Sequence, residues 1–586
     1  MKRKQYITAL TITAILLVIV FLAIKNLQQR SSALAFQYPF DGALFPNEFP
    51  APTFQWNDPD LTVQEWRIKL YLKNDSYFID TLIGNKSWKP SELQWDSLKK
   101  HSGGENIYAE LQQYSSQKPG KSARKRIHFK ISDDKVGAPI LYREVILPFV
   151  SAEANLDSLA YRLVNVGSAE PPHFAMKKFM VCANCHSFSS DGKTIALDLD
   201  AAKRDKGGYF IADIKDTMVF DTSNYLSWNK LQERATFGMF SKISPTGRYI
   251  VTTIKDRVVN ENFEYLPENI PFSQLFFPVN GILAVYDREE DKLWELPGAN
   301  SEEYVQSNAF WTPDGENIIF CRAKALEYTG DKDEIRVNDQ ALVDQFVNRE
   351  RDFKFDIYTI PFNNGKGGVT TPIKGASDNG KSNYFPAVSP DGKWLVFCQA
   401  DNYMLLNPDS KLYIIPVGGG KARQLKCNLP LMNSWHAWSP NSKWLVFSSK
   451  GLSIYTDLFL THIDEQGNAS VPVLIETVRR KGRAANYPEF VNISPDQKFN
   501  MIYNYVNLDH IVRAMLNGDT LQAIEMYEQY IEQDQFSLYE EYIFLANFTF
   551  GVKRYEEALH FAELALESDP NDGRALSLIK RIKSRL

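Results

Sequence analysis

The pattern of apolar and polar positions changes character twice along the chain. Residues 6–24 carry no charge and are almost continuously apolar. From 36 to about 505, short β-branched and aromatic runs alternate with clusters of Pro, Gly, Asn and Asp, which is typical of strands joined by tight turns. Beyond 508 the apolar residues recur at helical spacing. The sequence therefore predicts a mainly β protein with an apolar N-terminal segment and a small helical C-terminal domain.

The N-terminal segment is long enough to cross a bilayer as a helix. Met1–Lys4 contains three basic residues, which places the N-terminus in the cytoplasm and the bulk of the chain outside. An A-x-A-like cleavage signal lies at 33–35, too far beyond the apolar run for a signal peptide. We expect residues 1–30 to be an inner-membrane anchor and the rest to be periplasmic, with a cleaved signal as the alternative.

Residues 36–136 read as a β-sandwich because five strand-like runs alternate with turn residues. The opening stretch PFDGALFPNEFPAPTFQW resembles bacterial fibronectin-III or immunoglobulin-like modules. No catalytic pattern occurs in it, so we expect a spacer. Residues 137–180 are expected to be a linker.

The segment 181–507 contains an internal repeat. The repeat unit contains a tight turn in which Pro fixes φ and Gly or Asn adopts the positive φ that the turn requires. A run of apolar residues after the turn forms the next strand. Strands such as Lys411–Pro416 lie between the copies, so six units of four strands are predicted, as in a six-bladed propeller. Insertions fall at 259–280 and 325–354. The copies are HSFSSDGKTIALD, SKISPTGRYIVTT, AFWTPDGENIIFC, PAVSPDGKWLVFC, HAWSPNSKWLVFS and VNISPDQKFNMIY.

These repeats resemble the TolB-like propeller family, and the C-terminal domain at 508–586 resembles tetratricopeptide repeats, with related units around Gly518 and Lys553. Segments such as ATFGMFSKISP and MNSWHAWSPN also resemble a bacterial TolB-like group that joins a C-x-x-C-H segment to the propeller. The resemblance implies the fold and a haem; propellers host many activities, so it does not imply a reaction.

The strongest chemical motif is Cys182-Ala183-Asn184-Cys185-His186, which reads C-x-x-C-H. Two thiols at this spacing can form thioethers with the two vinyl groups of one haem, and the histidine that follows can bind the iron. The motif predicts haem c on Cys182 and Cys185 with His186 as the proximal ligand. A structural zinc site, which needs a fourth ligand, and a disulfide remain alternatives.

Several residues are candidates for the second iron ligand. His436 lies four residues before Pro440, and His186 lies four residues before the equivalent Ser190, so both histidines should lie near one mouth of the propeller channel. A histidine that only caps the inner strand is the alternative for His436. The other candidates are Met239, Met176, Met180 and His173.

Composition limits the classes of partner that we expect for this protein. The chain has 586 residues, 44% hydrophobic and 23% charged, with a net charge of −5, and it lacks the basic face that nucleic-acid binding requires. Of its five cysteines, Cys321 and Cys398 occupy apolar strands and are expected to fill the core, whereas Cys427 shows no partner pattern. Protein partners are expected at the propeller loops and the helical tail.

The predicted function is a monohaem electron-transfer or redox-sensing protein. The rival prediction is an interaction or envelope-assembly scaffold in which C-x-x-C-H is a disulfide or a metal clip. A hydrolase is disfavoured because the sequence has neither G-x-S-x-G nor H-E-x-x-H.

Overall fold

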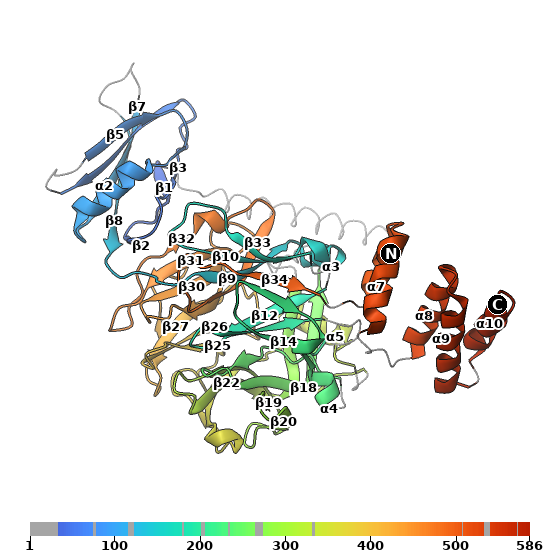
Figure 1. Ribbon diagram of the computed structural model, residues 1–586. Helices are drawn as coiled ribbons and strands as arrows, with labels where there is room; N and C mark the ends of the chain where they lie inside the picture. Colours follow the sequence, from blue (N-terminus) through green and yellow to red (C-terminus); the bar gives the residue numbers. More distant parts are fainter. Residues whose placement is uncertain are drawn as a thin grey trace, which may run out of the picture.

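The structure is a computed structural model that describes residues 33–73, 78–114, 122–178, 181–200, 206–232, 235–263, 274–330, 334–504, 506, 508–532, 539–570 and 572–586. Strands dominate up to residue 503, and helices follow (Figure 1). The expected anchor at 1–30 lies outside the described residues. Within the described ranges, no helix has the length and apolar character needed to span a membrane.

The N-terminal part consists of two sheets and one helix. The elements are β1 Ala35–Tyr38, β2 Ala43–Pro46, β3 Phe54–Asn57, β4 Glu65–Leu72, β5 Phe78–Ile83, β6 Ser87–Trp88, α2 Glu92–Ser102, β7 Ile107–Tyr114 and β8 Arg124–Ser132. The strand orders are β1-β3-β6 and β2-β8-β7-β4-β5. In β4 apolar and charged residues alternate, so one face turns inward. Its Trp66 packs against Trp56 of β3 in a shared core.

The central part is built from four-stranded antiparallel units. Two of these units, β17–β20 and β21–β24, share a single parallel bridge, Gly281 to Val305. The units are β12 Ala183–Phe188, β13 Thr194–Leu199, β14 Gly208–Asp213, β16 Tyr225–Ser227; β17 Lys242–Ile243, β18 Tyr249–Asn262, β19 Gln274–Asp287, β20 Lys292–Glu295; β21 Tyr304–Trp311, β22 Asn317–Lys324, β23 Asp356–Pro361, β24 Thr371–Pro372; β25 Ser382–Val388, β26 Trp394–Ala400, β27 Lys411–Pro416, β28 Arg423–Gln424; and β29 Asn433–Trp438, β30 Trp444–Ser449, β31 Asp457–His462, β32 Val473–Leu474.

A further unit joins the two ends of the central region. It has the order β11-β10-β9-β33, from β9 Ile140–Ile146, β10 Ala160–Val164, β11 His173–Lys177 and β33 Arg483–Phe490. Residues 137–180 therefore hold three strands of this unit, where the sequence predicted a linker. That segment lacks the turn motif, and its pairing to β33 joins residues more than 300 positions apart, so no local pattern announces it.

The last copy of the repeat also pairs with a strand that is distant in the sequence. Its strand, β34 Asn500–Tyr503, does not extend its own sheet. It runs parallel to β15 Thr217–Phe220, which follows β14 in the chain, and the two form a separate two-stranded sheet. The ends of the repeat region are thus joined both through β9 and β33 and through β15 and β34.

The repeated turn takes the expected form. In the first copy Ser189 Oγ donates to Asp191 Oδ1 at 2.6 Å, the same oxygen accepts the Lys193 N–H at 3.0 Å, and Gly192 has φ +69°. A side chain at Gly192 would lie 2.2 Å from the Asn492 carbonyl oxygen, so only glycine fits there.

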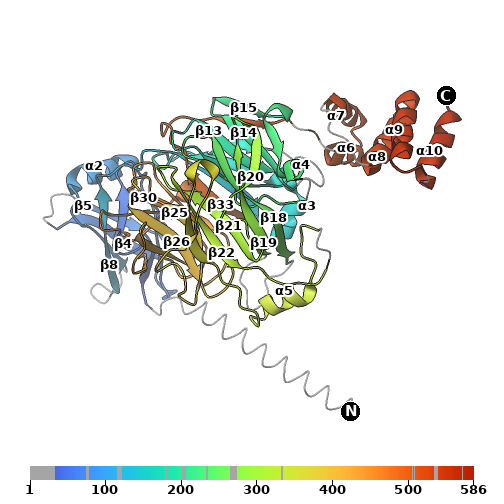
Figure 2. The same ribbon diagram turned by 90° about the horizontal axis from the view of Figure 1, so that it is seen from below.

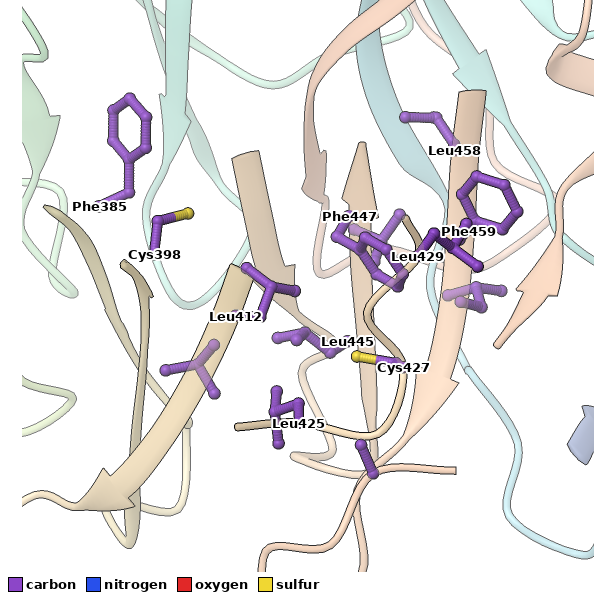
Figure 3. Packing of buried hydrophobic residues seen from close by; sticks show 14 of the residues in the cluster. Phe385, Cys398, Leu412, Leu425, Cys427, Leu429, Leu445, Phe447, Leu458 and Phe459 are labelled. Atoms are coloured by element: carbon purple, nitrogen blue, oxygen red, sulfur yellow. The ribbon is translucent and has the colours of Figure 1, made fainter. Parts of the chain in front are cut away.

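The three cysteines outside the motif are fully buried and carry free thiols. Cys398 and Cys427 lie among leucine and phenylalanine side chains of neighbouring units, as Figure 3 shows. Cys321 is packed in the same core cluster. The predicted role of Cys321 and Cys398 as core filling is confirmed.

After the N-terminal part, helices occupy the C-terminal end and three loops of the central part. The helices are α3 Phe149–Ala154, α4 Trp228–Gln232, α5 Gln340–Val347, α6 Leu508–Leu516, α7 Thr520–Glu532, α8 Tyr539–Gly551, α9 Tyr555–Ser568 and α10 Gly573–Lys583. α6 to α10 have an apolar core of their own. Seen from below, they lie at the opposite end of the molecule from the N-terminal sheets (Figure 2).

Candidate functional site

A β-bulge in β12 brings the two motif thiols to one cavity. Side chains three residues apart on a regular strand face opposite sides. In β12, however, Ala183 pairs with Leu199 and His186 with Leu197, so this strand contains one residue more than its partner. Cys182 and Cys185 consequently line the same space, which we call the cysteine cavity. The Tyr161 hydroxyl from β10 donates to the Asn184 carbonyl at 2.9 Å and holds the bulge.

The cysteine cavity is moderate in size and mixed in character. Its volume is about 290 Å³, at the lower end of the roughly 300–1,000 Å³ of usual ligand pockets. Aromatic and aliphatic side chains from several units form most of the wall. The charged residues that line it are Arg143, Asp198, Asp200, Lys206, Arg336 and Lys450.

Burial controls the charges in this cavity. It raises the pKa of Cys182 to about 11 and that of Cys185 to about 12, so both are neutral thiols at pH 7. Burial also raises the pKa of the Asp198 carboxyl well above its usual range. Asp200 pairs with Lys206. Desolvation lowers the pKa of Lys450 to about 8.

His186 does not line the cysteine cavity. Its side chain is 1% exposed and lies edge-on to the rings of Tyr161, Phe188 and Tyr487 at centroid distances of 5.6, 5.8 and 5.4 Å. Neither ring nitrogen makes a hydrogen bond of good geometry. Burial, and then the charge of Lys242, lowers the pKa of His186 to about 3, although the nearby Leu141 carbonyl opposes this shift. The imidazole is therefore neutral.

His436 lies elsewhere again. It lines a second cavity, which we call the turn-side cavity, near the repeat turns at the far ends of the inner strands. Its Nε2 is 3.1 Å from the Val396 carbonyl oxygen and its Nδ1 is 3.8 Å from Cys398 Sγ. Burial lowers its pKa to about 4. These contacts match the strand-capping alternative, and His436 does not line the cavity of Cys182 and Cys185.

The remaining candidates for the second iron ligand lie in different surroundings. Met239 lines the cysteine cavity together with both thiols. Met176 is packed in an apolar cluster, and His173 Nε2 lies 3.2 Å from the Phe499 carbonyl and 3.1 Å from Asn500 Oδ1. Met180 lies outside the described residues.

The residues fit a covalent haem only in part. Both thiols face a cavity with apolar walls and basic groups, which suits an apolar macrocycle that carries two carboxylates. The expected proximal ligand, His186, does not line that cavity. Over the part of the chain that the structure describes, no group of three or more His, Cys, Asp and Glu side chains stands close enough to hold a metal ion.

Sequence reasoning missed Arg143 and Asp198 of the cavity wall. Each is a charged residue inside an apolar strand, in ILYREVI and TIALDL respectively. A charge at a buried strand position is costly unless it has a function or a partner, so this pattern was the available signal.

Comparisons with known proteins are distant. No family model matches the sequence, and a search of curated proteins finds no match. Among solved structures, a TolB candidate from Agrobacterium tumefaciens is 12% identical with a TM-score of 0.31, covering 61% of this chain and 99% of that one. A periplasmic gluconolactonase from Pseudomonas aeruginosa is 13% identical with a TM-score of 0.30, covering 56% and 81%.

A puromycin-hydrolysing peptidase from Mycobacterium tuberculosis is 11% identical with a TM-score of 0.30. The match covers 50% of this chain and 38% of the peptidase, so it spans less than half of that protein. Likenesses at this distance carry no information about activity. The strand pairing within this chain defines its fold.

Proposed function

We propose that this chain is a membrane-anchored, periplasm-facing protein that carries one haem covalently on Cys182 and Cys185 and acts in electron transfer or redox sensing. One observation carries the proposal: the bulge in β12 directs both thiols of a C-x-x-C-H motif into one cavity. The apolar walls match a macrocycle, and the basic residues match its carboxylates.

The geometry divides the roles of the motif residues. Cys182 and Cys185 are the attachment points. His186 lies outside the cavity, so the proposal assigns it no bond to iron. The sequence offered five candidates for the second iron ligand, and of those within the described residues Met239 is the one that lines the cavity. Haem supplies one-electron transfer when bound; the protein's own part is to hold it, exclude water with aromatic walls and balance its charge.

The raised pKa values of both thiols argue against thiol–disulfide exchange. Cysteines that perform exchange are thiolates near neutral pH because their pKa values are lowered. Here burial moves both pKa values the other way. A permanent thioether does not need a thiolate in the folded protein.

The test is a spectrum of the full chain, exported together with cytochrome c maturation factors and denatured in alkaline pyridine with a reductant. The wild type is expected to give a haemochrome band that stays with the polypeptide. The variant Cys182→Ser with Cys185→Ser is expected to lose it, whereas Cys321→Ser, which alters a core thiol on β22 of another unit, keeps it. A colourless wild type overturns the proposal.

The second candidate is the scaffold. It is favoured by the helical tail, where Leu516 and Leu521 have side chains 81% and 77% exposed, as expected of a surface that contacts another protein. In that case a colourless protein would be followed by thiol titration and metal analysis, which separate a disulfide clip from a zinc clip.

We extend the proposal to the finer architecture. The four-stranded units, including the one closed by β33, are proposed to be six propeller blades, since each begins with an inner strand of the repeat. The N-terminal sheets are proposed to be an immunoglobulin or fibronectin-III-like sandwich, and α6 to α10 tetratricopeptide-like repeats. The apolar run at 6–24 is proposed to be the anchor.

A further inference from the structure

One wall of the cysteine cavity is formed by a segment without regular secondary structure. Residues 235–241 lie between α4 and β17 and adopt neither helix nor strand. Phe237, Met239 and Phe240 from this segment line the cavity together with the two motif thiols. Because no strand pairing fixes these residues, other contacts must satisfy their backbone groups and hold them in place.

A buried carboxyl group supplies those contacts. Asp256 of β18 is fully buried. Its Oδ1 accepts the Phe237 N–H at 2.6 Å, and its Oδ2 accepts the Met239 N–H at 3.2 Å. The Thr236 hydroxyl also donates to Oδ1. The two oxygens of one side chain thus bind three donors within four consecutive residues of the segment.

The strand that carries Asp256 is distorted at this point. A β-bulge in β18 places two residues, Lys255 and Asp256, opposite Gly281 of β19. Lys255 has φ +54°, a conformation that residues other than glycine keep only where the surrounding structure holds them. The sheet therefore departs from regular pairing next to the residue whose carboxyl group binds the segment 235–241.

We propose that Asp256 is a positioning residue of the cysteine cavity, which keeps the Met239 side chain in the wall of that cavity. Asp256 does not line the cavity itself, so it acts through the segment. Its oxygens bind the N–H groups on both sides of Gly238, and these bonds fix the backbone from which the Met239 side chain extends. A carboxyl group is costly to bury, and the three hydrogen bonds from the segment offset that cost.

Applied to haem, the inference rests on the proposed function. Among the described candidates for the second iron ligand, Met239 is the one that lines the cavity. Groups that hold a metal ligand in place control its availability to the metal. Asp256 then determines whether the Met239 thioether can serve as a ligand, but its positioning role can be tested without haem.

The experiment treats the haem-free full chain with hydrogen peroxide and follows sulfoxide formation at single methionines by mass spectrometry of peptides. Wild type is compared with Asp256→Asn, which replaces one acceptor oxygen by an NH2 donor. Met176 is the internal reference, because Met176 and Met239 are both 2% exposed and Met176 belongs to a different apolar cluster. Asp58→Asn is the matched control, because Asp58 is a buried acceptor for two side chains of the N-terminal part.

Met239 is expected to be oxidised about fivefold faster in Asp256→Asn than in wild type, because the segment opens more often once a hydrogen bond is lost. Met176 should keep its wild-type rate, and Asp58→Asn should leave the ratio of the two rates unchanged. No rise at Met239, an equal rise at both methionines, or the same selective rise in Asp58→Asn overturns the positioning role. If Asp256→Asn does not fold, Asp256→Glu, which displaces the carboxyl oxygens by one methylene, decides by the same criterion.

Haem-loaded protein tests the link to the iron. Asp256→Asn is expected to alter the ligand-sensitive spectrum as Met239→Leu does, whereas Asp58→Asn leaves it unchanged. An unchanged spectrum in Asp256→Asn refutes the link to the iron ligand. A chain that never takes haem refutes the proposed function, while the peroxide experiment still decides the positioning role.

Discussion

The inner strands β12 and β29 begin from the same sequence pattern and end with different geometry. His186 and His436 each lie four residues before the turn position, at Ser190 and Pro440. β29 bulges at Trp435 and His436, between the pairs Ser434 to Ser448 and Ala437 to Val446. β12 bulges one residue earlier, at Asn184 and Cys185.

This one-residue offset changes which side chains face each of the two cavities. Because strand side chains alternate, moving a bulge by one position turns the following residue to the other face. In β29 the histidine lines the turn-side cavity. In β12 the thiols line the cysteine cavity and the histidine is enclosed by aromatic rings. Equivalent sequence positions therefore do not imply a shared site.

The largest expected effect concerns the reactivity of the β12 thiols. In haem-free folded protein the pKa of Cys182 is raised to about 11. At pH 7 the fraction of Cys182 present as thiolate is therefore about a hundredfold smaller than that of an ordinary cysteine. Alkylation of both motif thiols by iodoacetamide should be slow at pH 7 and quicken about tenfold per pH unit. Urea-unfolded protein is the control. Fast alkylation of the folded protein at pH 7 would mean that the motif thiols are reactive enough for thiol–disulfide exchange.

The same substitution at the two histidines should have different consequences. His186 makes no hydrogen bond of good geometry through its ring nitrogens, so His186→Phe should change the free energy of unfolding by less than about 1 kcal/mol. His436→Phe removes the contact with the Val396 carbonyl and should destabilise by about 1–3 kcal/mol. Urea unfolding measures both. Equal losses would mean that the two rings have similar surroundings.

A smaller effect is expected from the hydroxyl that holds the bulge. Tyr161→Phe removes the donor to the Asn184 carbonyl and should cost about 1 kcal/mol. Tyr142→Phe is the matched control, because the Tyr142 hydroxyl is buried without a partner and its loss should be neutral or slightly stabilising. Thermal unfolding compares them. If Tyr142→Phe proved the more damaging change, the hydroxyl of Tyr161 would have no role in the bulge.

Local patterns predicted much of the fold. The turn motif and its strands, the strand at Lys411–Pro416, the buried cysteines and the helices beyond 508 follow from short-range spacing of apolar and turn residues. The unit completed by β9, β10 and β11 could not be foreseen, because its pairing to β33 is long-range and each strand alone is a short apolar run.

The sequence predicted which types of residue form the site but not how they are arranged in space. The sequence identified the two thiols and Met239, which the structure brings to one cavity. It grouped His186 and His436 because the position of a β-bulge leaves no reliable trace in a single sequence. Arg143 carried a signal, a charge within ILYREVI, but its place in the cavity wall becomes visible only in the folded chain.

The most direct test of this account is the ligand-sensitive spectrum of the haem iron in haem-loaded full-length protein, compared between wild type, His186→Phe and Met239→Leu. The account predicts an unchanged spectrum in His186→Phe and an altered one in Met239→Leu, because only Met239 shares a cavity with the thiols. Loss of the wild-type spectrum in His186→Phe, with Met239→Leu unchanged, would contradict the division of roles that the β12 bulge imposes.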